Sequence, residues 1–141
     1  MRVVLDTNVL LPSIRRGSRY RPLLDGLLAG RYTLIVSTPI LLEYEEVIAR
    51  RTTAEVAQNV LGALLALPNV ERVEPRFLWR LIIADPDDDK FVDACIGAGA
   101  DLLVTHDAHF GVLEGLDFPP VTVVSAGDFM ERLGIEPGDR P

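Results

Sequence analysis

The chain has 141 residues, 48% of them hydrophobic and 25% charged, which is typical of a folded protein with one core. The formal net charge of −7 argues against simple nucleic-acid binding through a basic surface, and the single cysteine, Cys95, excludes an internal disulfide. Apolar runs are too short to span a bilayer, and no signal-peptide pattern is present at the N-terminus. We therefore expect a cytoplasmic protein with no membrane association, forming a single domain over 1–141 with an ordered core at about 2–133.

Strands and helices alternate in the first part of the chain. Residues 2–5 (RVVL) predict a buried strand, and Thr7 or Asn8 can cap the short helix after it. A second helix is predicted at about 20–29 and a second strand at 32–36. The apolar stripe of that second helix consists of Leu23, Leu24, Leu27 and Leu28.

The next two helices have clear start signals. Ser37 followed by Pro39 predicts a capped helix that runs to about Arg51. Thr53 begins another, which runs to about Leu67. Its inward residues are predicted to be Val56, Val60, Leu61, Leu64 and Leu65.

The second half begins with weaker signals, a short strand at 70–73 and a helical turn at 77–81. An acid-rich loop then leads into a helix at 87–98, which Gly99 ends. The remaining predicted elements are a strand at 102–105, a loop or short helix at 106–113, a strand at 121–124, a helix that ends at 133, and a tail at 134–141 that we expect to fray.

This alternation predicts an α/β fold, a parallel sheet with helices on both faces. Ligands of such sheets bind beyond the carboxyl ends of the strands. Asp6 and Asp107 directly follow predicted strands, Glu43 lies in the helix after the second strand, and Asp89 and Asp93 lie early in the helix before the fourth. We expect these carboxylates to converge on one edge of the sheet.

Some acids in this part of the chain have ordinary structural explanations. Asp87 and Asp88 suit a helix N-terminus, where each stabilises by roughly 0.3–1 kcal/mol, and Asp85 before a proline suits a turn. Asp6 and Asp107 are harder to explain in this way, because each follows a buried apolar strand.

Crowded carboxylates repel one another, and a divalent cation offsets that repulsion. An all-oxygen set without cysteine or histidine suits Mg²⁺ or Mn²⁺, which can activate water for phosphodiester hydrolysis. His106 and His109 do not form a zinc motif. The acids therefore predict a magnesium or manganese site.

The basic residues are almost all arginine, with Lys90 the only lysine among 14. Arginine suits bidentate contacts with phosphate or carboxylate, although scattered solvated arginines explain the same composition. The clusters are Arg15, Arg16, Arg19 and Arg21, and the pair Arg50 and Arg51.

Three motifs, LDTNVLL at 5–11, STPILLEYEEV at 37–47 and DPDDDKFVDACIGAGADLLVTHDAHF at 85–110, resemble the PIN-domain ribonucleases. The chain is most similar to the VapC-like branch, the toxin components of toxin–antitoxin pairs, and the resemblance extends from residue 2 to about 133. It implies a three-layer α/β/α sandwich with a central parallel sheet, and a Mg²⁺- or Mn²⁺-dependent site that cuts RNA to leave a 5′-phosphate and a 3′-hydroxyl.

The resemblance also implies roles for individual residues. Its metal-binding and catalytic acids match Asp6, Glu43, Asp89 and Asp107. Asn8 and Thr105 match polar positions that orient the acids or water. Many toxin members carry alanine where this chain has Asp93, which we interpret as either an outer-shell acid or a solvated one.

The resemblance further implies partners: an RNA substrate, a cognate antitoxin and a second copy of the chain. The arginine clusters named above would hold RNA or the acidic tail of an antitoxin. The exposed apolar faces of the helices at 39–67 are the candidate surface for a homodimer.

Three alternatives stay open at this stage. The chain could be a housekeeping RNA-processing nuclease, or a PIN-like module that binds a partner without cleaving anything. Phosphatases that form an aspartyl-phosphate also begin with an aspartate after the first strand. They need a second aspartate where this chain has Asn8, and a later lysine for which only Lys90 is available.

Overall fold

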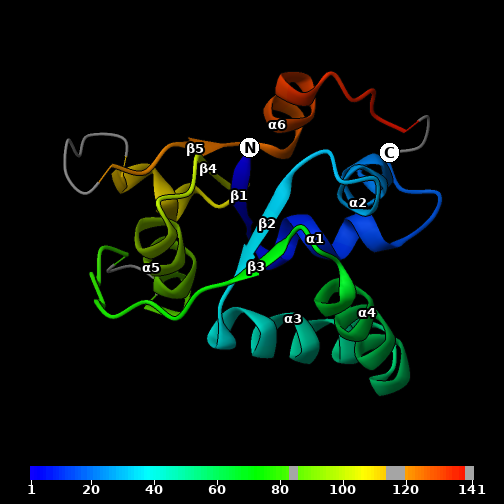
Figure 1. The fold of residues 1–141 in the computed structure, drawn as a ribbon, viewed down its shortest axis with the longest axis horizontal. Coiled ribbons are helices and arrows are strands. Elements are labelled where there is room, and N and C mark those ends of the chain that lie inside the picture. The colour runs from blue at the N-terminus through cyan, green and yellow to red at the C-terminus, as the bar shows by residue number, and fades with distance from the viewer. Residues whose placement is uncertain (83–85, 114–119, 139–141) are drawn as a thin grey trace.

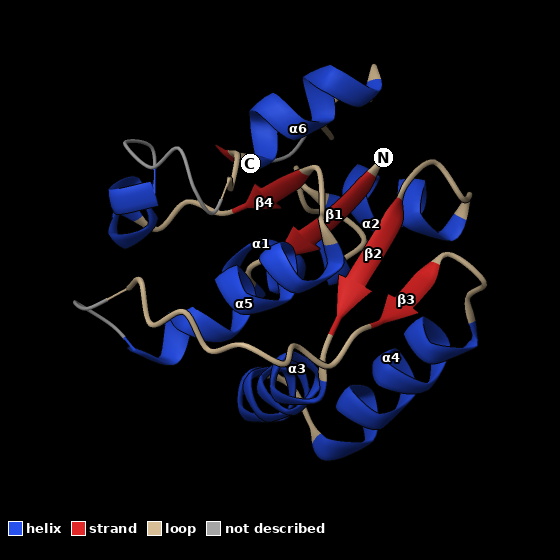
Figure 2. Ribbon diagram, turned by 60° about the vertical axis from the view of Figure 1, so that its left-hand side comes forward, coloured by secondary structure: helices blue, strands red, loops and turns tan. Residues whose placement is uncertain are grey.

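A five-stranded parallel sheet with the order β3-β2-β1-β4-β5 forms the centre of the computed structural model, which describes residues 1–82, 86–113 and 120–138. Figure 2 shows β4, β1, β2 and β3 side by side in that order. β1 lies between β2 and β4, with Val3 paired to both Leu34 and Leu102. The strands are β1 Arg2–Leu5, β2 Thr33–Val36, β3 Val70–Arg72, β4 Leu102–Val104 and β5 Val123–Val124.

Helices cover both faces of the sheet, with α5 on one side and α1 and α2 on the other (Figure 1). The predicted three-layer α/β/α sandwich with a parallel sheet is therefore confirmed. α3 and α4 pack against each other beyond the carboxyl end of β2. The helices are α1 Thr7–Ile14, α2 Arg21–Leu28, α3 Thr38–Arg51, α4 Ala54–Ala66, α5 Asp89–Ala98 and α6 Ala126–Leu133, with 3₁₀-helices η1 Pro86–Asp88 and η2 Ala108–Leu113.

Side-chain caps begin the helices where the sequence predicted them. The Ser37 hydroxyl accepts from the backbone N–H of Ile40, and the Thr53 hydroxyl accepts from that of Val56 at 3.1 Å. Gly99 ends α5 in the left-handed conformation, with a φ of 61°, which residues with a Cβ rarely adopt. These local signals fix where α3, α4 and α5 lie relative to the sheet.

The cap of α1 is a correction to the sequence prediction. The cap residue is Asp6, whose carboxylate accepts from the N–H of Asn8 at 3.4 Å, and neither Thr7 nor Asn8 has this role. Thr7 is instead the first residue of the helix, because the strand ends one residue earlier than such a cap would require. The Asp6 carboxylate therefore caps α1 through one oxygen, and its other oxygen can still take part in a site.

Two predicted apolar stripes are too wide. Leu28 of α2 and Leu65 of α4 are exposed, whereas Gly26 and Ala57 occupy inward positions. The inward arc of each helix is narrow because small residues let the helix approach its neighbours closely. Leu65 is thereby left on the outer surface of the α3–α4 pair.

The segment at 77–81 and the tail also differ from expectation. Residues 77–81 form no helix. Part of the tail is bound to the body of the protein, because the N–H of Gly138 donates to the Arg19 carbonyl at 2.9 Å and Ile135 packs beside Gly26. Among the helices of the described residues, none is long and apolar enough to cross a membrane.

Candidate metal site at the carboxyl edge of the sheet

Asp6 lies where β1 and β4 end, at the carboxyl edge of the sheet. Its backbone N–H donates to the Val104 carbonyl at 3.0 Å, which ties it to the neighbouring strand. The side chain is buried, and the Thr105 hydroxyl donates to its Oδ2 at 2.7 Å. The Asn8 N–H reaches the other oxygen, so the carboxylate is held from both sides.

Glu43 and Asp107 place their negative charges close enough to act on Asp6. Burial raises the pKa of Asp6, the hydrogen bond from Thr105 opposes that rise, and the charges of Glu43 and Asp107 add to it. The charges of Glu43, in α3, and of Asp107, beyond the end of β4, therefore both reach Asp6 at the carboxyl edge of the sheet. The hydroxyl of Thr105 also accepts from the Asp107 N–H at 3.0 Å, and so links two of the acids.

Two residues that sequence reasoning missed hold Glu43. The Thr7 hydroxyl donates to Glu43 Oε2, and the Lys90 ammonium lies 2.8 Å from Oε1. Both Lys90 and Glu43 are largely shielded from solvent. The sequence did carry a signal, because Lys90 is the only lysine and lies among aspartates.

Asp89 and Asp93 face a different partner, the segment at 77–82. Asp89 Oδ1 accepts from the Ile82 N–H at 2.8 Å, and Asp93 Oδ1 accepts from the Trp79 N–H at 2.9 Å. Asp93 is only 4% exposed, so its interpretation as a solvated acid is wrong. Burial raises the pKa of Asp93, and the charge of Asp89 raises it further. Asp89 therefore lies in the predicted region and serves the backbone of this segment.

The polar residues and a tyrosine complete the edge. Thr105 has the orienting position predicted for it, whereas Asn8 contributes through its backbone and its side chain is exposed. The hydroxyl of Tyr44 donates to the Leu5 carbonyl at 2.5 Å, and burial raises the pKa of Tyr44. Tyr44 thereby fixes α3, and with it Glu43, against the end of β1.

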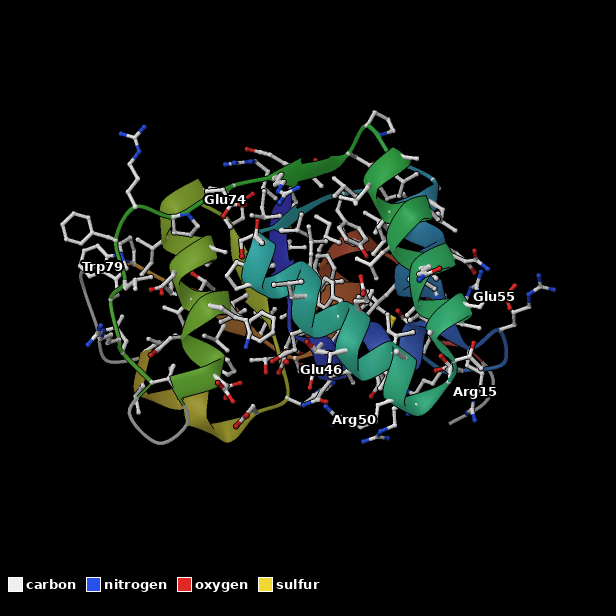
Figure 3. The ribbon with its side chains drawn as sticks, turned by 90° about the horizontal axis from the view of Figure 1, so that it is seen from below. Arg15, Glu46, Arg50, Glu55, Glu74 and Trp79 are labelled. Atoms are coloured by element: carbon white, nitrogen blue, oxygen red, sulfur yellow. The ribbon has the colours of Figure 1, made fainter. Side chains whose placement is uncertain are left out.

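The arginine clusters lie on a different part of the surface. Figure 3 shows Arg15 and Trp79 at opposite sides of the view, with Arg50 between them at the end of α3. Arg21 is paired with Asp25 and Arg50 with Glu46, each at 2.9 Å. The exposed members of the clusters are Arg15, Arg16, Arg19, Arg50 and Arg51.

The residues at this edge fit a divalent cation in their chemistry. The donors are carboxylate oxygens, which suit Mg²⁺ or Mn²⁺. Burial is the main cause of the raised pKa of Asp6, and the charges of Glu43 and Asp107 add a smaller part that a cation would offset. In the part of the chain that the structure describes, no three acidic, histidine or cysteine side chains stand close enough to hold a metal as they are. The ammonium of Lys90 is the cation that Glu43 contacts, and a metal would take its place.

Comparison with known proteins places this arrangement in a family. Residues 2–109 match the PIN domain family. Among curated proteins, no sequence matches closely enough to count as a relative. A chain in the crystal structure of VapBC2 from Rickettsia felis, bound to a DNA fragment from their promoter, is 20% identical with a TM-score of 0.61, over 89% of this chain and 98% of that one.

The second similar structure is that of FitAB bound to an IR36 DNA fragment. It is 16% identical with a TM-score of 0.57, over 88% of this chain and 94% of that one. At these identities the two structures support the fold, and the family match carries the assignment.

Proposed function

Because the chain belongs to the PIN domain family, we propose that it is a cytoplasmic endoribonuclease that depends on Mg²⁺ or Mn²⁺ and hydrolyses RNA phosphodiesters. The observation that carries this proposal is that carboxylates from three separate segments come together at the carboxyl edge of the sheet. The charges of Glu43 and Asp107 both act on the buried Asp6, whose pKa is raised mainly by burial. Acids grouped at the ligand-binding edge of a parallel sheet are typical of a functional site.

The chain's own residues would prepare the site for that reaction. Asp6, Glu43 and Asp107 would hold the cation together with Asp89, and the cation would supply charge stabilisation and an acidified water. Thr105 holds Asp6, so that this carboxylate keeps one orientation. The expected products are a 5′-phosphate and a 3′-hydroxyl, which end-group analysis of the cleaved RNA can identify.

A matched pair of variants on α3 tests this proposal. Glu43→Gln removes a carboxylate that acts on Asp6, whereas Glu45→Gln removes an exposed carboxylate of the same helix. We expect Glu43→Gln and Asp6→Asn to reduce Mn²⁺-dependent RNA cleavage by about 100-fold or more, because each variant would lose a proposed metal ligand. Glu45→Gln should cleave like the wild type.

The opposite results would favour a non-catalytic module. Undiminished cleavage by Asp6→Asn would sink the assignment of the site. Failure of the wild-type protein to bind Mn²⁺ in a calorimetric titration would favour a PIN-like interaction module, because such a module does not need the metal.

We further propose that the nuclease is the toxin of a toxin–antitoxin pair, with an antitoxin as its protein partner. Support comes from the similarity to chains in the VapBC2 and FitAB structures. Exposed arginines such as Arg15 and Arg51 would bind an acidic tail of the antitoxin or the RNA backbone. Growth arrest on induced expression, relieved by a neighbouring gene product, would support the toxin; normal growth would favour an RNA-processing nuclease.

A homodimer through α3 and α4 is part of this proposal. Leu42 is 63% exposed and Leu65 is 51% exposed, on two helices that pack side by side. Exposed leucines on neighbouring helices would lose their contact with water if a second copy covered them. Sedimentation should show a dimer that Leu42→Asp converts to a monomer, whereas a wild-type monomer at all concentrations would contradict this surface.

A further inference from the structure

The segment at 75–82, which we call the strap, follows β3 in the sequence and runs beside α5. It has neither helix nor strand and is fixed by the two hydrogen bonds from Trp79 and Ile82 to the carboxylates of Asp93 and Asp89. Figure 3 shows Trp79 at the outer edge of the molecule, beyond α5. The strap is thus an ordered stretch of backbone held at the protein surface by two buried or half-buried acids.

Large apolar side chains on the strap point into solvent. Phe77 is 72% exposed and Leu78 is 66% exposed. The rings of Phe77 and Trp79 lie 5.6 Å apart between centroids, at an interplanar angle of 33°. Phe77 is exposed and Trp79 is half-buried, so this aromatic pair presents a surface that a ligand can cover.

The strap is also locally cationic. Its sequence, PRFLWRLI, carries Arg76 and Arg80 and no acid, in a chain whose net charge is −7. Both arginines are exposed, and the preceding acid, Glu74, is already paired with Arg72 and bonded to Thr38. Arg80 has a φ of 53°, a left-handed conformation that residues other than glycine rarely adopt.

A pocket of about 620 Å³ lies between the strap and the start of α5. Leu78, Arg80 and Ile82 line it from the strap. Asp89, Lys90 and Asp93 line it from α5, and Glu74 lies at its rim before the strap. Its volume is within the range of small-molecule sites, about 300–1,000 Å³, and suits a nucleotide. Because Lys90 contacts Glu43, a ligand in this pocket would lie next to the candidate metal site.

We propose that the strap and its pocket bind single-stranded RNA next to the candidate metal site. Bases would stack on Phe77 and Trp79, while the guanidinium groups of Arg76 and Arg80 would contact phosphates. Aromatic and arginine side chains interleaved on one surface are the chemistry that single-stranded nucleic acid uses. The acids next to the strap already have partners, because Glu74 pairs with Arg72 while Asp89 and Asp93 accept from the backbone of the strap. Arg76 and Arg80 are therefore the exposed charges that the strap offers to a polyanion. This inference rests on the proposed ribonuclease function.

The experiment uses Trp79, the only tryptophan in the chain, as its probe. The full-length protein is titrated with a short oligoadenosine RNA in EDTA and low salt, so that no cleavage occurs. Stacking should quench the tryptophan emission and give a Kd. Phe77→Ala should weaken binding about tenfold, since stacking contributes about 1–3 kcal/mol per base.

A second variant keeps the test free of folding artefacts. Arg80→Gly removes the guanidinium at a position where glycine accepts the backbone conformation better than arginine does. It should fold at least as well, bind RNA several-fold more weakly, and lower the salt dependence by about one phosphate contact. Arg132→Ala and Leu28→Ala, at exposed positions on α6 and α2, are the controls and should bind like the wild type.

Absence of quenching, or wild-type affinity in both Phe77→Ala and Arg80→Gly, would overturn the proposal. Quenching by an antitoxin's apolar tail without any response to RNA would also overturn it and assign the strap to a protein partner. The nuclease proposal fails separately. RNA binding by the strap without metal-dependent cleavage would contradict the nuclease proposal alone. Cleavage with an unchanged KM in Phe77→Ala would contradict the proposed role of the strap alone.

Discussion

Two pairs of acids at the same edge of the sheet differ in what faces them. Asp6 and Glu43 face other carboxylates, a hydroxyl and one ammonium, so their charges are only partly balanced. Asp89 and Asp93 each accept a hydrogen bond from a backbone N–H of the strap. Acidic side chains therefore form a charged site at Asp6 and Glu43 and a structural anchor at Asp89 and Asp93. The groups that face each pair account for the difference.

The largest effect on stability is expected at Asp93, one of the two acids that anchor the strap. Asp93→Ala leaves the part-buried N–H of Trp79 without this acceptor, which should lower the free energy of unfolding by about 1 kcal/mol. It should also shift the Trp79 emission to longer wavelength, because the strap loosens. Thermal unfolding and fluorescence spectra measure both effects.

Asp93→Asn is the matched control for that prediction. The amide oxygen can still accept from Trp79, and burial and Asp89 raise the pKa of Asp93, so loss of its charge should not destabilise the fold. Equal destabilisation by the alanine and asparagine variants would show that charge, and not the acceptor, is what matters at Asp93. Asp93 would then resemble Asp6 and Glu43 in depending on its charge, and the contrast between the two pairs of acids would not hold.

A smaller effect, on Mn²⁺ binding, is expected at Lys90, which follows Asp89 in α5 and contacts Glu43. Lys90→Gln removes the ammonium beside Glu43, and a Mn²⁺ ion would no longer compete with it. The ion pair is worth about 1 kcal/mol, so the Kd for Mn²⁺ should fall about fivefold in a calorimetric titration. Lys90→Arg keeps the charge and should bind Mn²⁺ like the wild type. Weaker binding in Lys90→Gln would mean that Lys90 supports the metal site.

Physical rules account for which parts of this edge were predictable. The convergence of Asp6, Glu43 and Asp107 follows from the parallel sheet, because strands that point the same way end at the same edge. To place those three residues it is enough to know where the strands end and where α3 begins. Hydrophobic runs mark the strand ends in the sequence, and the Ser37 cap marks the start of α3.

The anchor role of Asp89 and Asp93 was not predictable in the same way. Their partners are backbone N–H groups of Trp79 and Ile82, and a backbone donor leaves no mark in the side-chain pattern. The strap itself resembled a helical turn, because its apolar residues are close together in sequence. Tertiary hydrogen bonds outweighed that weak local preference.

The smallest predicted effect is the pH dependence of stability at Asp6. Its pKa is raised in the fold, so the folded state binds the proton more tightly than the unfolded chain, whose pKa is near 3.8. Ionisation of Asp6 therefore destabilises the fold, fully above the raised pKa and not at all below about 3.8. Asp6→Asn removes this penalty and should raise Tm at pH 7. The advantage should vanish as the pH falls toward 3.8, and saturating Mn²⁺ should reverse it, because only the wild type gains the cation. A Tm for Asp6→Asn below that of the wild type at pH 7 without metal would show that Asp6 is an anchor like Asp93, and the contrast between the two pairs would disappear.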